Sequence, residues 1–235
     1  MIFRKAKMPH SASELDARDK RRRGREPEPE GHHFPEAESE YQDPTHDPGR
    51  HRATPDRGPY DAADIDVESD EWIDLGGILL RPMEGTELRL QVDEGSQTVM
   101  AALLVAGESA LELRAFAASR SGGLWDELRR EIAAETTRRG GTVTEANGPY
   151  GAELKVVVSG RQPDGSTGTQ VSRIIGVDGP RWFLRGTLLG RAAQEPDQAE
   201  PLLHALGHVA VVRGKGPMAP RDMIPLKLPD QAQQL

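Results

Sequence analysis

The stretch of the sequence best suited to binding chemistry alternates arginine with large apolar side chains, reading RWFLRG over residues 181–186. In a β-strand, successive side chains point to opposite faces, so Arg181, Phe183 and Arg185 would share one face. Guanidinium groups beside an aromatic ring can bind anions, nucleotides and acidic peptides through charge-assisted hydrogen bonds. Together with an arginine on the preceding predicted strand, they form our candidate surface for a small anion or ligand: Arg173, Arg181, Phe183 and Arg185.

The same alternation also fits a strand with a purely structural role. We favour this interpretation, because solvated arginines are common on strands. If Arg185 is covered by another element, it needs an acidic partner, since a buried unpaired charge is strongly destabilising. Glu153 and Asp178, on neighbouring predicted strands, are the expected partners.

A second candidate contact is a basic cluster in the N-terminal part of the chain. Residues 1–25 contain nine Lys or Arg against three Asp or Glu, whereas residues 26–70 contain three against fourteen. The cluster could attract the phosphates of nucleic acid; it consists of Lys20, Arg21, Arg22, Arg23 and Arg25. The adjacent acidic stretch competes for these charges, and the net charge of the chain is −8, so we favour a solvated tail over nucleic-acid binding.

Sequence signals for catalysis or cofactor binding are weak. The chain has no cysteine, which excludes disulfides, thiolate metal sites and cysteine nucleophiles. Residues 213–218 (RGKGPM) lack the first glycine and the Ser or Thr of a phosphate-binding loop. His204 and His208 have the spacing of two helical metal ligands, but no third ligand is apparent. We therefore predict no catalytic, cofactor-binding or metal-binding residues, no cofactor and no enzymatic activity.

Composition divides the chain into three regions. Residues 1–70 contain only four Ile, Leu or Val, too few to offset chain entropy, so they are predicted to form a disordered charged tail whose end, near Tyr60, could dock on the domain or on a partner. Residues 71–214 carry strand and helix patterns and form the predicted domain. Residues 215–235 contain prolines at 217, 220, 225 and 229 and are predicted to form an extended strap.

The first half of the domain has the pattern of an antiparallel meander. Strands are predicted over residues 72–82, with a bend at two glycines, and over 87–94, 98–107 and 110–119. The third of these segments is apolar on both faces, which is typical of a central strand.

A long helix is expected after the meander, capped by Ser121 or Gly123 and ended by Gly140. Its apolar stripe is Leu124, Trp125, Leu128 and Ile132. We interpret the tryptophan as a core residue, because a tryptophan in such a stripe is more often buried than ligand-binding. The strand face expected beneath this helix carries Trp182, Leu184 and Leu188.

The second half of the domain returns to strands, predicted over residues 151–160, 169–177 and 181–190. Asp-Gly and Gly-Pro sequences at 163–165 and 178–180 are typical of hairpin turns between them. A short helix within 195–208 and a closing strand over 209–214 complete the domain. Because helices do not alternate with every strand, the sequence predicts an α+β fold, mainly an antiparallel sheet with one long and one short helix packed on it.

Four segments together resemble a family of uncharacterised actinobacterial proteins known only as a domain of unknown function. The motifs are LGGILLRP, SGGLWDEL, DGPRWFLRG and VVRGKGPMAPRDMIPLKLP, and the resemblance covers about residues 58–230. It implies an actinobacterial cytoplasmic protein and no known activity. The order of elements is also distantly similar to the PsbP-like α/β/α sandwich, a group whose members mostly bind or scaffold, although this chain lacks their lipoproteins' signal peptide, lipidated cysteine and disulfide.

These observations predict a non-enzymatic cytoplasmic binding or adaptor protein that holds a protein partner. The N-terminus lacks the apolar region of a secretory signal, and no stretch is long and apolar enough to span a membrane, so no membrane contact is expected. Two alternatives stay open: an accessory protein that binds nucleic acid through the basic cluster and strand arginines, and a small-anion or ligand pocket near Arg185.

Overall fold

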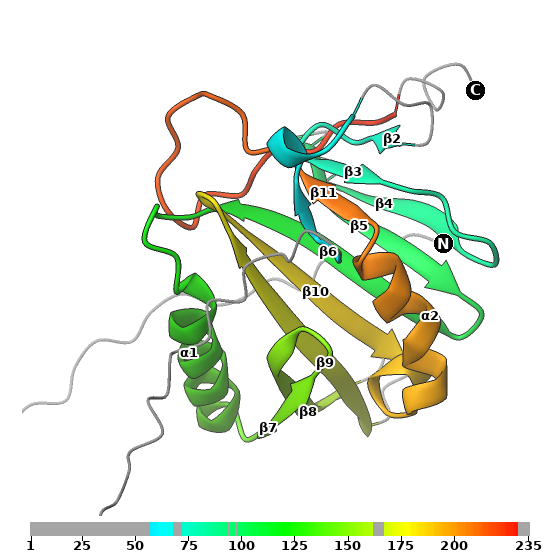
Figure 1. The fold of residues 1–235 in the computed structure, drawn as a ribbon. Helices are drawn as coiled ribbons and strands as arrows, with labels where there is room; N and C mark the ends of the chain where they lie inside the picture. Colours follow the sequence, from blue (N-terminus) through cyan, green and yellow to red (C-terminus); the bar gives the residue numbers. More distant parts are fainter. Residues whose placement is uncertain (1–56, 68–71, 94, 97, 162–166, 230–235) are drawn as a thin grey trace, which may run out of the picture. The chain divides into compact units, whose positions relative to one another are not determined.

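The computed structural model describes residues 57–67, 72–93, 95–96, 98–161 and 167–229. A seven-stranded antiparallel sheet lies at the centre of the domain, with one α-helix on each face (Figure 1). The strand order is β4-β5-β6-β10-β9-β8-β7. The strands are β4 (Glu87–Asp93), β5 (Thr98–Ala106), β6 (Ser109–Ala117), β7 (Thr142–Gly148), β8 (Gly151–Arg161), β9 (Thr167–Gly179) and β10 (Trp182–Gly190). The predicted α+β class is confirmed.

The interior strands have the residue pattern that their positions require. Every second residue of β6 is buried, so that Leu111, Leu113 and Ala115 face one side of the sheet while the residues between them are partly exposed. In β10, by contrast, Trp182 and Phe183 are both fully buried. Because these two side chains point to opposite faces, β10 is covered on both sides.

A second, four-stranded sheet packs beside the first. It includes residues 72–82, which were predicted to be the first strand of the meander. Residues 72–82 form two short antiparallel strands, β2 (Ile73–Asp74) and β3 (Ile78–Leu80), not one bent strand. The chain reverses at Gly76, whose φ is +80°, a conformation that side chains other than glycine rarely adopt. The sheet order is β1-β11-β3-β2, with β1 (Tyr60–Asp61) parallel to β11 (Val209–Val211). The meander of the large sheet therefore has three strands, β4 to β6.

Strand β7 was not predicted from the sequence. It is an edge strand with a mostly exposed, polar sequence, so it lacks the alternating apolar residues that mark half-buried strands. The hairpin predicted at 178–180 is confirmed between β9 and β10. Strands β8 and β9 also pair antiparallel, whereas their predicted turn at 163–165 lies outside the described residues.

The two helices lie where the sequence predicts them, α1 over Leu124–Arg138 and α2 over Pro196–Leu206. Acidic residues occupy the first turn of α1 and Arg138 its last turn, an order that complements the helix dipole. Trp125 is 1% exposed, which confirms that it is a core residue. Short 3₁₀ turns, η1 (Ala62–Asp64) and η2 (Arg191–Ala193), flank β1 and α2.

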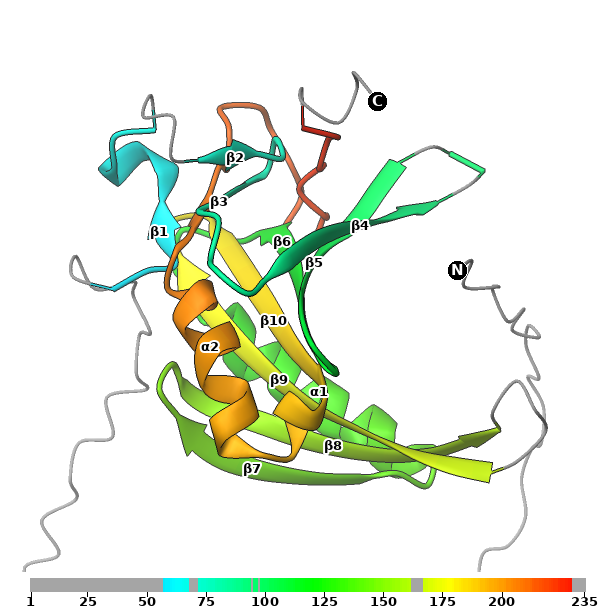
Figure 2. The ribbon, with the colours of Figure 1, turned by 90° about the vertical axis from the view of Figure 1, so that its right-hand side faces the viewer.

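The prediction of which face of β10 lies under α1 was wrong. Helix α1 packs on the face of Phe183, whereas Trp182, Leu184 and Leu188 belong to the larger core cluster on the opposite face, with α2 and the small sheet. Figure 2 shows α2 in front of the large sheet and α1 behind it. Alternation had correctly separated the two sets of side chains, but each set includes a large aromatic residue, Trp182 in one and Phe183 in the other, so alternation could not decide which helix covers which set.

The ends of the described chain are tied to the domain. Tyr60 and Asp61 pair with β11, although the predicted boundary at residue 71 places them in the tail. Residues 215–229 lie against the domain and make a turn at residues 219–222, so the predicted strap is not extended throughout. The backbone nitrogen of Ile224 donates to the Ala115 carbonyl at 2.9 Å. Residues 1–56 of the predicted tail, including the basic cluster Lys20–Arg25, and residues 68–71 and 230–235 lie outside the described residues.

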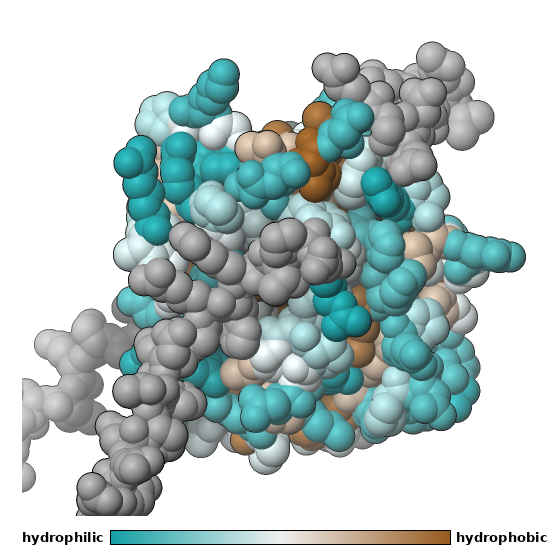
Figure 3. Space-filling view, in the orientation of Figure 1, coloured by the Kyte–Doolittle hydropathy of each residue, from teal (hydrophilic) through white to brown (hydrophobic). Residues whose placement is uncertain are grey.

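The described surface is predominantly hydrophilic on the face shown in Figure 3. Three large apolar side chains are classed as exposed within the described ranges, at 38–42%: Val67, Val92 and Leu228. Neither α1 nor α2 is long and apolar enough to cross a membrane.

Candidate functional site

The four residues of the predicted binding surface do not come together. Phe183 is fully buried beneath α1, and Arg181 lies in the tight turn between β9 and β10. Arg173 is two residues from Ile175 along β9 and therefore shares the face of the α2 side, while Arg185 shares the face of Phe183. The prediction that they form one surface was therefore wrong.

Arg185 is a largely buried side chain in a row of charges on the sheet. It lies directly opposite Arg114 in the β10–β6 register, and one of its terminal nitrogens is 3.8 Å from the Glu112 carboxylate. Its guanidinium also lies 5.6 Å from the centre of the Phe116 ring. Burial, together with the like charge of Arg114, lowers the pKa of Arg185 below its usual value.

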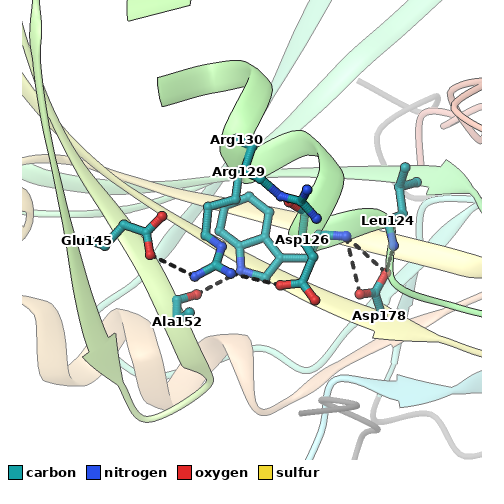
Figure 4. Close-up of polar contacts among 8 residues, drawn as sticks. Leu124, Asp126, Arg129, Arg130, Glu145, Ala152 and Asp178 are labelled. Carbon is teal, nitrogen blue, oxygen red and sulfur yellow. Dashed lines mark hydrogen bonds and ion pairs between the residues drawn. The ribbon is translucent and has the colours of Figure 1, made fainter. Parts of the chain in front are cut away.

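The acidic partners expected for Arg185 have other roles. Glu153 pairs with Arg173. Figure 4 shows that Asp178 accepts hydrogen bonds from the first backbone nitrogens of α1. The same close-up shows Arg129 reaching both Asp126 on its own helix and Glu145 on β7. These contacts fix α1 on the sheet, so this face serves mainly to hold the helix.

A recess of the described domain lies on the other face. A cleft of about 1140 Å³ separates α2 from the sheet end formed by β7, β8 and β9. Met83 and the segment around Arg57 and Tyr60 also line it. Five separate parts of the chain therefore line it: the first described residues, Met83, the β7–β8 hairpin, Arg173 on β9, and residues 193–208 with α2.

An ion pair lies on the sheet wall of this cleft. Nε of Arg173 is 2.6 Å from the Glu153 carboxylate, and the two side chains are 17% and 8% exposed. A Cβ atom added to Gly148 would lie 2.2 Å from Oε2 of Glu153, so the carboxylate packs directly against the hairpin backbone. The pair is thus held in position by β8, β9 and the β7–β8 turn together.

Tyr150 connects the two walls. Its hydroxyl donates a 2.8 Å hydrogen bond to the carbonyl oxygen of Leu203 on α2. Burial raises the pKa of Tyr150 to about 12, so the phenol stays protonated and remains a donor throughout the physiological range.

His204 and His208 line the cleft at the end of α2. Their ring centres are 4.5 Å apart, and Nδ1 of His208 lies 2.9 Å from the His204 carbonyl oxygen. In the part of the chain that the structure describes, no group of three or more His, Asp or Glu side chains is placed to hold a metal ion. The two histidines therefore contribute polar and aromatic surface to the cleft.

The charges of the two walls differ. Helix α2 contributes two exposed acidic residues, Asp197 and Glu200. Strand β8 contributes an exposed basic residue, Lys155, beside the Glu153–Arg173 pair. Rings and apolar side chains also line the cleft: Tyr60, Met83, Pro149, Tyr150, Pro196 and Pro201. The cleft is therefore suited to a ligand that carries both charges and apolar groups along its length.

Sequence reasoning missed most of this site. Tyr150 and Lys155 carry no motif, and their only local signal is the turn-forming sequence NGPYG before a predicted strand. Their neighbours on α2 lie about fifty residues later in the chain. Only the pairing of β7, β8 and β9 under α2 brings them together.

Comparison with known proteins identifies the family. The chain matches the model of a family described as "Protein of unknown function (DUF3710)" over residues 58–235, which includes nearly all the described residues. No curated protein matches it. The predicted relationship to a domain-of-unknown-function family is confirmed, while the actinobacterial origin stays a prediction. The chain thus belongs to the DUF3710 family.

Proposed function

We propose that this protein is a non-enzymatic binding protein whose cleft between α2 and the β7–β9 sheet end holds an extended segment of a partner polypeptide. The observation that carries the proposal is the size of the cleft together with its divided charge. Its volume of about 1140 Å³ exceeds the roughly 300–1000 Å³ of small-molecule pockets. Its acidic wall on α2 and its basic residue on β8 would fix the direction of a peptide with charges of both signs.

The ionisable groups of the cleft support binding over catalysis. Glu153 forms an ion pair with Arg173, and the Tyr150 hydroxyl donates a hydrogen bond to a backbone carbonyl. A general acid or base must be able to reach a substrate proton, whereas these groups hold the walls in place. We therefore assign them positioning roles. We also propose that the protein is cytoplasmic, as the sequence predicts.

Site-specific photo-crosslinking in cell extract tests the proposal. A photoreactive residue at Glu200, on the α2 wall, should give a protein adduct from the full-length chain, whereas one at exposed Ala134 on α1 should not. Lys155→Glu should abolish the adduct, because it reverses the charge of the sheet wall. Lys215→Glu, an exposed change outside this cleft, should leave the adduct unchanged.

Three outcomes would contradict peptide binding in the cleft. These are equal adducts from residues 134 and 200, an adduct that survives Lys155→Glu, and an adduct that disappears after nuclease treatment. The last result would favour the alternative in which the basic cluster Lys20–Arg25 recruits nucleic acid.

A further inference from the structure

A second, smaller hollow of about 480 Å³ lies apart from the cleft, where the chain after β11 passes the turn between β6 and α1. Figure 1 shows this loop arching beside the start of α1. Three arginines from three separate segments line the hollow: Arg120 before α1, Arg181 in the β9–β10 turn, and Arg213 after β11. We infer that the hollow is a binding site for a phosphate group.

The lining of the hollow has more positive than negative charge, with three arginines and one aspartate. Asp222 is the one acidic residue in its lining, and its Oδ2 already accepts a hydrogen bond from the Ala219 nitrogen at 2.9 Å. Within the described ranges, neither Arg120 nor Arg181 forms an ion pair with a carboxylate. Convergent guanidinium groups repel one another unless an anion lies between them, and arginine's planar donors match phosphate oxygens.

The position of Arg213 is fixed. Its Nε donates to the Arg181 carbonyl at 3.0 Å and its Nη1 to the Gly216 carbonyl at 3.3 Å. The Arg181 carbonyl also accepts from the Ala118 nitrogen at 2.9 Å. These bonds hold the turn and the loop against each other and leave further N–H donors of Arg213 for a ligand.

The backbone conformation of Arg181 is a second, independent indication that the hollow binds a ligand. Two described residues other than glycine have positive φ, and both are arginines: Arg181 at 64° and Arg221 at 75°. Arg221 has a structural reason, because it forms ion pairs with Glu127 and Glu131 on α1. Arg181 has no such partner, although glycine or asparagine would suit its conformation better. A side chain kept in an unfavourable conformation beside a hollow indicates a functional requirement for that side chain.

The test is binding of inorganic phosphate to the full-length protein, measured by calorimetry against chloride and acetate at equal ionic strength. Arg181→Gly should weaken phosphate binding at least tenfold, while the protein stays as stable as the wild type or becomes more stable. Arg120→Gln, a change at an exposed position, should weaken binding similarly. Arg221→Gly is the matched control, because it changes the other positive-φ arginine, and it should leave phosphate affinity unchanged.

The proposal would be overturned if phosphate bound no better than acetate or chloride. It would also be overturned if Arg181→Gly and Arg120→Gln kept wild-type affinity, or if Arg221→Gly weakened binding as much as they do. The phosphate site is independent of the proposed peptide cleft. Lys155→Glu should therefore leave phosphate binding intact, whatever it does to the crosslinked adduct.

Discussion

Asp178 accepts a hydrogen bond from the backbone nitrogen of Trp125 at 3.2 Å, although the two residues are 53 positions apart. The other carboxylate oxygen accepts from the Leu124 nitrogen at 3.1 Å. The N-cap position of α1 is Gly123, which has no side chain to perform this function. The end of β9 therefore caps the helix and fixes its start on the sheet.

Removing this cap should destabilise the protein. Asp178→Ala should lower the free energy of unfolding by about 1 kcal/mol, the usual loss when a helix-capping side chain is removed. Asp178→Asn keeps an acceptor oxygen and should cost less. Urea unfolding followed by circular dichroism measures both variants. Equal losses for Ala and Asn would show that the charge, and not the hydrogen bond, provides the stabilisation.

Gly176 should not tolerate a side chain. A Cβ atom there would lie 2.2 Å from Cδ2 of Trp125, a buried residue of α1 that packs on the sheet. Gly176→Ala should therefore lower the free energy of unfolding by about 1–3 kcal/mol, the usual range for overpacking a core. Gly160→Ala on β8 is the matched control, since a Cβ there meets no atom within 4 Å. Similar unfolding midpoints for the two variants would disprove the close packing of Trp125 on β9.

Tyr150 should titrate at unusually high pH. Its pKa is about 12, against an ordinary value of 10.0, because burial disfavours the charged phenolate. Its contribution to stability should be constant below pH 10 and should decrease as the pH rises from about 10 to about 12, since the unfolded chain loses the proton first. Ultraviolet absorbance of the phenolate measures the titration, and Tyr150→Phe should remove the late component. A spectrum in which every tyrosine ionises near pH 10 would contradict a buried, donating phenol.

Asp61 should be required for stability although it lies outside the predicted domain. Its Oδ2 accepts a 2.9 Å hydrogen bond from Nε1 of fully buried Trp182. Asp61→Ala leaves this donor without its partner and should cost about 1–3 kcal/mol. Asp64→Ala, an exposed change three residues later, should stay within about 0.5 kcal/mol of the wild type. Thermal unfolding compares the two, and equal melting temperatures would show that β1 adds little to the domain.

The position of the domain boundary can be tested in the same way. A chain that begins at residue 72 lacks β1 and the Asp61 contact, so it should unfold at lower temperature than a chain that begins at residue 57. Composition alone placed the boundary near residue 71, because the preceding residues are mostly polar. The pairing of Tyr60 and Asp61 with β11 involves residues about 150 positions apart, and no local pattern reveals it.

The sequence by itself determined the main strands, both helices and the buried position of Trp125. Alternation and helical periodicity are local properties, and each strand or helix must present an apolar face to a core. Only the tertiary structure decided which helix covers Phe183. It also decided that Glu153 pairs with Arg173 and not with Arg185, and that the Tyr150 hydroxyl bonds to Leu203. These relationships depend on strand order and on which face each helix covers. Because each face of β10 carries a large buried side chain, Trp182 on one and Phe183 on the other, its local pattern is compatible with either arrangement, and only packing of the whole chain selects one.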